Sequence, residues 1–181
     1  MKFLHTPLNG CIVMTPAIFS DSRGSFYESY KKGVIDEALG YEVNFVQDNE
    51  SFSSKGVLRG LHFQKGEYAQ AKLVRVIQGA VLDVAVDLRE ESSTYGQHFS
   101  IELSSDNKKQ LFIPRGFAHG FVVLSDTAIF SYKCDNYYHK DSESGIIYND
   151  PTLNIDWKFP NDHLQLSKKD LELPHFKSLA L

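Results

Sequence analysis

The chain has 181 residues, of which 42% are hydrophobic and 23% charged, and its formal net charge is -4. This composition is typical of a globular protein, and the length suffices for a domain with a sizeable core. We therefore expect a single domain over residues 1–181. A net negative chain lacks the basic excess that neutralises nucleic-acid phosphates, so we expect no nucleic-acid partner.

The sequence gives no sign of an oxidising or membrane environment. Its two cysteines, Cys11 and Cys134, form neither a disulfide framework nor a zinc-binding pattern. Residues 1–10 contain no long apolar run of the kind found in a secretory signal. No other stretch approaches the ~20 apolar residues that a membrane helix needs. We therefore expect a cytoplasmic protein with no membrane partner.

The first expected element is a short helix, because apolar residues recur at helical spacing from Val34 to Leu39 and Gly40 suits its end. From Lys72 onwards the pattern changes to short strands. They are expected at residues 72–77, 80–88, 99–103, 109–113, 120–124 and 128–134. Many short strands separated by turn residues predict an all-β sandwich or barrel.

The strand expected at residues 80–88 alternates strictly. Its aliphatic row consists of Leu82, Val84, Val86 and Leu88, and Asp83 lies on the opposite face. An ionisable group on the concave face of a barrel needs a reason, since burying an unpaired charge is costly.

The last expected element is a short turn that Ser167–Asp170 opens as a capping box and Pro174 ends. In that interpretation the Asp170 carboxylate serves only to cap the turn.

A cluster of polar residues ends the segment QDNESFSSKGVLRGLHFQ, residues 47–64. Its histidine, His62, has three interpretations: a general base, a metal ligand or a packed core residue. Lys72, in the next strand, favours a functional role. In a flat strand Arg59 and His62 fall on opposite faces, so both reach one site only if the strand bends, which Gly60 permits.

The segment IPRGFAHGF, residues 113–121, matches the second sequence motif of cupin barrels. In metal-binding cupins its histidine, here His119, is a ligand. The first cupin motif needs a His-x-His pair, but this chain has His62 followed by Gln64. Two histidines make a poor zinc or iron site, so we expect no metal.

A further candidate is Tyr132, which shares a strand face with Ala128 and Phe130. A tyrosine in a strand usually serves packing, but one whose hydroxyl points into a cavity can deliver a proton.

Seven motifs in series resemble the dTDP-4-dehydrorhamnose 3,5-epimerase family, over roughly residues 10 to 175. They are FSDSRGSFYE at 19–28, QDN with VLRGLHFQ at 47–64, AKLVRV at 71–76, DVAVDLR at 83–89, IPRGFAHGF at 113–121, YKCDNYY at 132–138, and Ile155–Trp157 with LSKKD at 166–170. The resemblance implies an all-β, double-stranded β-helix (jelly-roll, cupin-like) barrel with a few short helices, usually a homodimer.

The family's substrate is a dTDP-linked 4-keto-6-deoxyhexose, in which the ketone acidifies the protons on carbon 3 and carbon 5. The resemblance implies that His62 is the base, Asp170 its partner carboxylate and Tyr132 the acid on the opposite face. Lys72 matches the cation that stabilises the enolate. No cofactor is implied. With this resemblance, the role of Asp170 beside His62 competes with its role as a cap.

Eight further residues match positions that hold the substrate. Those beside the nucleoside, sugar and diphosphate are Phe19, Arg23, Glu28, Gln47, Asn49, Arg59, His119 and Tyr138. Arg23 would bind phosphate, a role that suits a guanidinium group, from this chain or from a neighbouring subunit.

Three alternatives remain open from the sequence. Some relatives invert only one of the two carbons or act on other sugar nucleotides. A metal-dependent cupin and a sugar-binding cupin without catalysis are the other two. The prediction is the double epimerase of dTDP-4-dehydro-6-deoxy-D-glucose, acting in dTDP-rhamnose synthesis.

Overall fold

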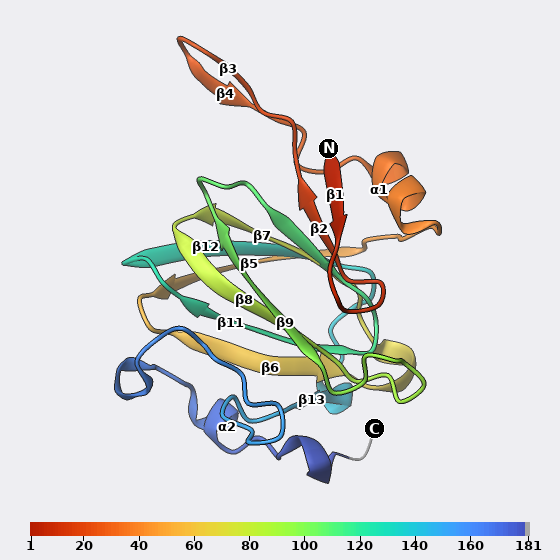
Figure 1. Ribbon diagram of the computed structural model, residues 1–181, viewed down its shortest axis with the longest axis vertical. Helices are drawn as coiled ribbons and strands as arrows, with labels where there is room; N and C mark the ends of the chain where they lie inside the picture. The colour runs from red at the N-terminus through yellow and green to blue at the C-terminus, as the bar shows by residue number, and fades with distance from the viewer. Residues whose placement is uncertain (180–181) are drawn as a thin grey trace.

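The computed structural model describes residues 1–179 and is built mainly from two antiparallel β-sheets that pack face to face (Figure 1). The first has six strands in the order β1 (Lys2–His5), β2 (Ile12–Thr15), β10 (Gln110–Ile113), β7 (Lys72–Gln78), β12 (Thr127–Cys134) and β5 (Gln47–Ser54). The second has five, in the order β13 (Glu143–Gly145), β6 (Leu58–Gln64), β11 (Phe117–Val123), β8 (Ala80–Asp87) and β9 (His98–Ser104).

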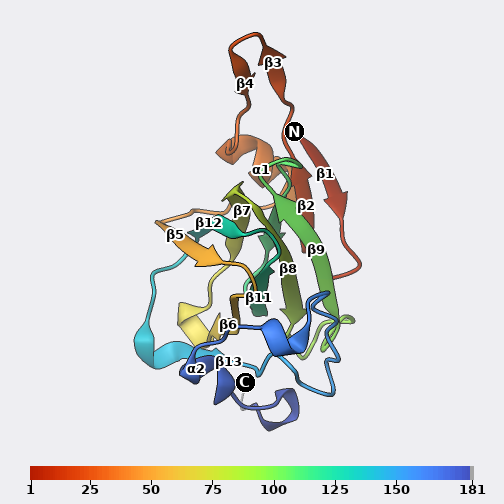
Figure 2. The same cartoon turned by 90° about the vertical axis from the view of Figure 1, so that its left-hand side faces the viewer.

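The remaining elements are short. A separate hairpin, β3 (Phe19–Asp21) with β4 (Gly24–Phe26), extends away from both sheets in Figures 1 and 2. The helices are α1 (Lys32–Leu39) and α2 (Lys168–Leu171), with 3₁₀ turns η1 (Gly66–Tyr68), η2 (Lys140–Ser142), η3 (Asn161–His163) and η4 (Phe176–Ser178). No helix within residues 1–179 has the length and apolar character to cross a membrane.

The expected fold class is confirmed. All six strands predicted between residues 72 and 134 are present, and α1 ends at Gly40, which adopts a left-handed φ of 78°. The structure differs from the expected barrel in one respect. Within residues 1–179, no strand of one sheet pairs with a strand of the other, so the two sheets do not close into a barrel. The single domain over residues 1–181 stays a prediction, and its last two residues lie outside the described part.

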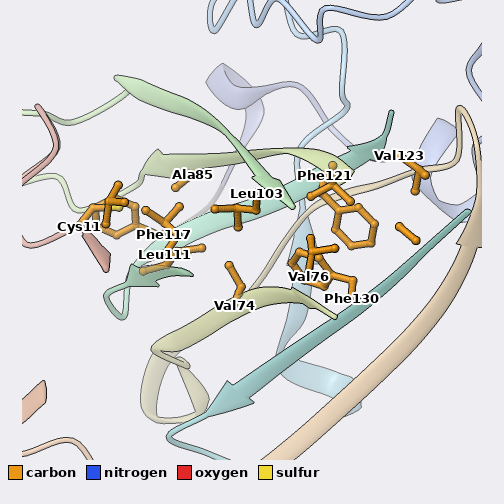
Figure 3. Packing of buried hydrophobic residues seen from close by; sticks show 14 of the residues in the cluster. Cys11, Val74, Val76, Ala85, Leu103, Leu111, Phe117, Phe121, Val123 and Phe130 are labelled. Carbon is orange, nitrogen blue, oxygen red and sulfur yellow. The ribbon is translucent and has the colours of Figure 1, made fainter. Parts of the chain in front are cut away.

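The interior between the sheets is apolar over most of its length. Val74, Leu111 and Phe130 from the six-stranded sheet meet Phe121 from the five-stranded sheet, and the rings of Phe121 and Phe130 stack at 4.2 Å (Figure 3). Closely packed aromatic and branched side chains of this kind supply most of the stability of a small domain.

The five-stranded sheet is buried on both faces. The aliphatic row of β8 faces outward, where the C-terminal segment covers it with side chains such as Ile146 and Trp157. The opposite face of β8 turns inward, so the fully buried Asp83 lies on the interior side of the sheet, next to Ala85 of the inner cluster. The predicted alternation of β8 is therefore confirmed.

A bulge in β6 determines which of its side chains face the interior. Arg59 pairs with Phe121 and His62 with His119, so two residues of β6 oppose only Gly120 of β11. Gly60 has a φ of 136°, and an added Cβ there would lie 2.5 Å from the Cα of Gly120. Glycine is required at this close approach.

Asp87, at the end of β8, is a buried carboxylate with a structural role. It accepts hydrogen bonds from the guanidinium of Arg89 and the hydroxyls of Ser92 and Thr94. Burial alone would raise its pKa, but these bonds lower it to about 2.

We therefore predict an acid-sensitive contribution to stability from Asp87. Because its folded pKa is lowered, this contribution is present above about pH 4 and is lost as the pH falls towards 2; it amounts to ~2 kcal/mol. Asp87→Asn should lower the free energy of unfolding at neutral pH by about that amount, measured by urea denaturation. Equal stability of the two proteins at neutral pH would contradict this.

Candidate active site

A cavity of about 560 Å³ opens between the two sheets and beside the C-terminal segment. Its ionisable lining residues are Glu50, Arg59, His62, Lys72, His119, Tyr132, Glu143, Lys169 and Asp170. A second cavity of about 300 Å³ shares His62, Lys72, Tyr132 and Glu143 with the first and is also lined by Gln47, Asn49 and Tyr138. The two cavities therefore adjoin at the histidine, the lysine and the tyrosine.

His62 and Asp170 form an imidazole–carboxylate pair at this junction. The His62 Nε2 lies 2.7 Å from Asp170 Oδ1, and the Asp170 side chain is buried. Burial alone would raise the Asp170 pKa, but the hydrogen bond and charge of His62, with contacts from Ser167 and the Gly60 amide, lower it below its ordinary value. The ionised carboxylate favours a proton on Nε2 and stabilises the imidazolium that forms when His62 takes up a proton.

The C-terminal segment brings Asp170 to this position across 108 residues of sequence. The backbone of Gln165 donates to the Gly56 carbonyl and accepts from the Leu58 amide, which holds the segment against the start of β6. The Ser167 hydroxyl then accepts the backbone N–H of Asp170 and caps α2. The expectation that the Asp170 carboxylate caps the turn is therefore wrong: only its backbone N–H takes part in the cap, and its carboxylate binds His62.

We predict that Asp170→Ala removes most of the activity without unfolding the protein. The variant keeps the backbone N–H that Ser167 caps, and loses only the carboxylate that orients His62. The expected drop in kcat is ~10²- to 10⁴-fold. Steady-state kinetics and a thermal melt check it, and normal turnover of a folded Asp170→Ala protein would rule out this role.

Tyr132 and Lys72 approach the cavity from the six-stranded sheet, facing the sheet that carries His62. Burial raises the Tyr132 pKa, so the phenol keeps its proton at neutral pH. The Lys72 Nζ lies 5.9 Å from the centre of the Tyr132 ring, and within residues 1–179 no ion pair engages it. Burial lowers the pKa of Lys72, and the nearby carboxylates Asp83 and Glu143 act in the opposite direction.

His119 lies beside His62 on the neighbouring strand β11 and lines the same cavity. Its Nε2 is 2.9 Å from Oδ2 of the buried Asp83. Arg59, brought to the same side as His62 by the bulge in β6, donates from Nε to the Ser53 hydroxyl at 3.1 Å. The expected bend at Gly60 is thus confirmed.

Amide groups surround the second cavity. Gln47 donates to Asn49 at 2.9 Å and accepts the backbone N–H of Tyr138 at 3.0 Å. The Tyr138 hydroxyl donates to Glu143 at 2.9 Å, and Lys169 donates to the same carboxylate at 2.5 Å. Burial alone would raise the pKa of Glu143, but these hydrogen bonds lower it.

Three of the predicted binding residues are not brought to either cavity within this chain. Phe19 and Arg23 lie on the exposed β3–β4 hairpin, with 88% of the Arg23 side chain accessible and its guanidinium paired with Asp21. Glu28 follows the hairpin and lies 3.5 Å from Lys31.

Sequence reasoning missed Glu143 and Lys169. Glu143 belongs to the three-residue strand β13, which is too short to show alternation. Lys169 lies in the four-residue α2, where the sequence analysis assigned a functional role to its neighbour Asp170 and none to the lysine.

Gln64 replaces the second histidine of the cupin motif and has a structural role. Its side chain donates to the carbonyls of Tyr68 and Tyr137 and accepts the N–H of His139. Within residues 1–179, no group of three or more histidine, cysteine, aspartate or glutamate side chains is arranged to hold a metal ion.

An imidazole–carboxylate pair on one wall of a cavity and a protonated phenol on the other equip a protein to move protons on both faces of a bound molecule. Fold and site together thus define an acid–base enzyme on a jelly-roll scaffold.

Comparison with known proteins specifies this class further. A family model described as dTDP-4-dehydrorhamnose 3,5-epimerase matches residues 5–178. The Escherichia coli dTDP-4-dehydrorhamnose 3,5-epimerase is 54% identical over 173 residues, which cover 96% of this chain and 93% of the relative. The chain belongs to the dTDP-4-dehydrorhamnose 3,5-epimerase family, so the resemblance inferred from its motifs is confirmed.

Two crystal structures agree with the fold throughout. The dTDP-4-dehydrorhamnose 3,5-epimerase of Elizabethkingia anophelis has a TM-score of 0.95 at 56% identity, with 98% of this chain and 97% of that chain covered. An epimerase of Legionella pneumophila, solved in complex with dTDP-4-keto-L-rhamnose, has a TM-score of 0.94 at 48% identity and coverage of 98% and 94%.

Proposed function

We propose that this chain inverts carbon 3 and carbon 5 of dTDP-4-dehydro-6-deoxy-D-glucose to give dTDP-4-dehydro-L-rhamnose, in the synthesis of dTDP-rhamnose for surface polysaccharide. The observation that supports this most strongly is the His62–Asp170 pair, at 2.7 Å, facing Tyr132 across one cavity. The related Legionella pneumophila epimerase is solved in complex with dTDP-4-keto-L-rhamnose, which is the proposed product under another name.

Inversion needs a base on one face of the sugar and an acid on the other. In the proposed reaction His62 removes the proton from carbon 3, which leaves an enolate whose charge lies on the oxygen of carbon 4. Lys72 stabilises that oxygen, and Tyr132 returns a proton from the opposite face. Exchange with solvent then removes the proton from His62 and returns one to Tyr132, so that the same steps at carbon 5 complete the reaction. No cofactor takes part.

The amide-lined second cavity, with Gln47, Asn49 and Tyr138, is proposed to hold the nucleoside. Arg59 and His119 are proposed to lie beside the sugar and diphosphate. A stacked aromatic ring with amide contacts suits a pyrimidine, and guanidinium groups suit phosphate.

We also propose that the enzyme is a homodimer in which Phe19, Arg23 and Glu28 of one subunit complete the site of the other. The β3–β4 hairpin supports this, because it leaves 65% of Phe19 and 68% of Phe26 exposed. Exposed aromatic side chains on a projecting element mark an interaction surface. No nucleic acid or membrane is proposed as a partner, and the proposed location is the cytoplasm.

Complementation tests the shared site. Arg23→Ala and His62→Ala subunits, each nearly inactive alone, form mixed dimers when they are co-expressed. Random pairing makes about half of the dimers mixed. If Arg23 acts across the interface, one of the two sites in each mixed dimer has both wild-type residues. About a quarter of all sites are then active, and activity returns to that extent. Absence of recovery in mixed dimers would place Arg23 outside the partner's site.

The reaction itself is tested with purified protein, chelator and dTDP-4-dehydro-6-deoxy-D-glucose. Carbon NMR of the sugar should show dTDP-4-dehydro-L-rhamnose, with the rate unaffected by the chelator. A rate that requires an added metal would instead support a metal-dependent cupin, and binding without conversion would support a sugar-binding protein.

A further inference from the structure

Asp83 is a buried carboxylate that the proposed reaction does not use. It lies on the inward face of β8 with no exposed surface. One oxygen, Oδ2, is 2.9 Å from Nε2 of His119. The other, Oδ1, is buried and has no hydrogen-bond partner within residues 1–179.

Asp87, on the same face of the same strand, shows how a buried carboxylate that serves stability is bound. Both of its oxygens accept hydrogen bonds, from the side chains of Arg89, Ser92 and Thr94. A buried carboxylate oxygen without a partner lowers stability, and such groups in folded proteins commonly have a functional reason. Asp83 therefore has the features of a functional residue.

The contact of Asp83 with His119 determines what the imidazole presents to the cavity. A carboxylate only accepts hydrogen bonds, so the proton of neutral His119 lies on Nε2 and the lone pair lies on Nδ1. Within residues 1–179, Nδ1 of His119 has no hydrogen-bond partner. The ring is further held by the nearly parallel ring of Phe130, with centroids 6.0 Å apart.

The arrangement repeats that of the base. His62 and His119 are direct partners in the β6–β11 register, both line the same cavity, and each is bound at Nε2 by an aspartate. Side chains directly opposite on one face of a sheet lie close together. His119 lines the larger cavity and not the amide-lined one, so it lies away from the proposed nucleoside site.

We propose that Asp83 is a positioning residue for the epimerisation: it fixes the tautomer and orientation of His119, whose Nδ1 accepts a hydrogen bond from a sugar hydroxyl beside the reacting carbons. The proposal rests on the proposed function. It adds a second imidazole–carboxylate pair to the site, one that holds the sugar while His62 moves the proton.

The test compares Asp83→Asn with Asp87→Asn, a matched change on the same strand. The asparagine amide at position 83 can donate to Nε2, which transfers the His119 proton to Nδ1 and removes the acceptor. We expect kcat to fall ~10²-fold, the effect of a misplaced substrate, with melting temperature unchanged or higher. Asp87→Asn should keep kcat and lower the melting temperature by roughly 5 °C.

Nitrogen-15 NMR of the histidine rings provides the second readout. In the ligand-free wild type, His119 should carry its proton on Nε2; in Asp83→Asn it should carry it on Nδ1. A wild-type His119 protonated on Nδ1 overturns the proposal even if Asp83→Asn fails to fold.

Two further outcomes separate the proposals. Full turnover by folded Asp83→Asn protein overturns the role of Asp83 and leaves the proposed function intact. Lack of epimerisation by the wild type overturns the proposed function itself.

Discussion

His62→Ala will abolish proton exchange at both carbon 3 and carbon 5, with kcat lowered ~10⁴-fold, because one base serves both carbons in the proposed reaction. The Asp170 carboxylate binds the imidazole, and 31% of the His62 side chain is accessible to a substrate. The measurement is deuterium incorporation followed by NMR, with the affinity for dTDP as a check on the binding site.

His163→Ala is the matched control for this variant. His163 lies in η3, with 69% of its side chain exposed and its Nε2 3.7 Å from Oδ2 of Asp162. The His163→Ala variant should catalyse deuterium exchange into the sugar at the wild-type rate. If His62→Ala retained exchange at one of the two carbons, a second base would have to act there, and the single-base reaction would be wrong.

Tyr132→Phe will separate proton removal from inversion. The change deletes one hydroxyl and leaves His62, Asp170 and Lys72 in place. His62 can still remove a proton and return it from the same face, so we expect deuterium exchange to continue while formation of the inverted product falls ~10³-fold. Burial keeps the phenol protonated at neutral pH, as an acid requires. Affinity for dTDP should stay unchanged.

Tyr95→Phe serves as the control for that experiment. The ring centroid of Tyr95 lies 5.4 Å from that of Phe176, and Tyr95 does not line either cavity. It should retain full activity. Inverted product formed by Tyr132→Phe at the wild-type rate would show that another group returns the proton.

The strands of the middle of the chain were predictable because each carries its own local signal. The alternation of β8 places the aliphatic row outward and Asp83 inward, as the period of a strand requires. The strands β3, β4 and β13 have only three residues each, too few to contain a readable period.

The bulge in β6 was foreseeable only in part. The three-residue spacing of Arg59 and His62 required a departure from a flat strand, and Gly60 was the residue that allowed it. The sequence does not show that Gly120, on another strand, is the residue that lets the two backbones approach.

Pairings between distant segments were beyond sequence reasoning alone. The contact of Asp170 with His62 was inferred through a family resemblance. Only the geometry of α2 showed that the backbone N–H of Asp170, and not its carboxylate, takes part in the cap. The pairing of Asp83 with His119 and the Glu143–Lys169 pair follow from strand order and from the path of the C-terminal segment. Neither has a local signature in the sequence.

The double inversion is tested by incubating the protein with dTDP-4-dehydro-6-deoxy-D-glucose in heavy water and following the sugar ring by NMR. We expect deuterium at both carbon 3 and carbon 5, with inversion at each. Deuterium at one carbon only would make this a single-carbon epimerase, and no incorporation at either carbon would contradict the epimerase function.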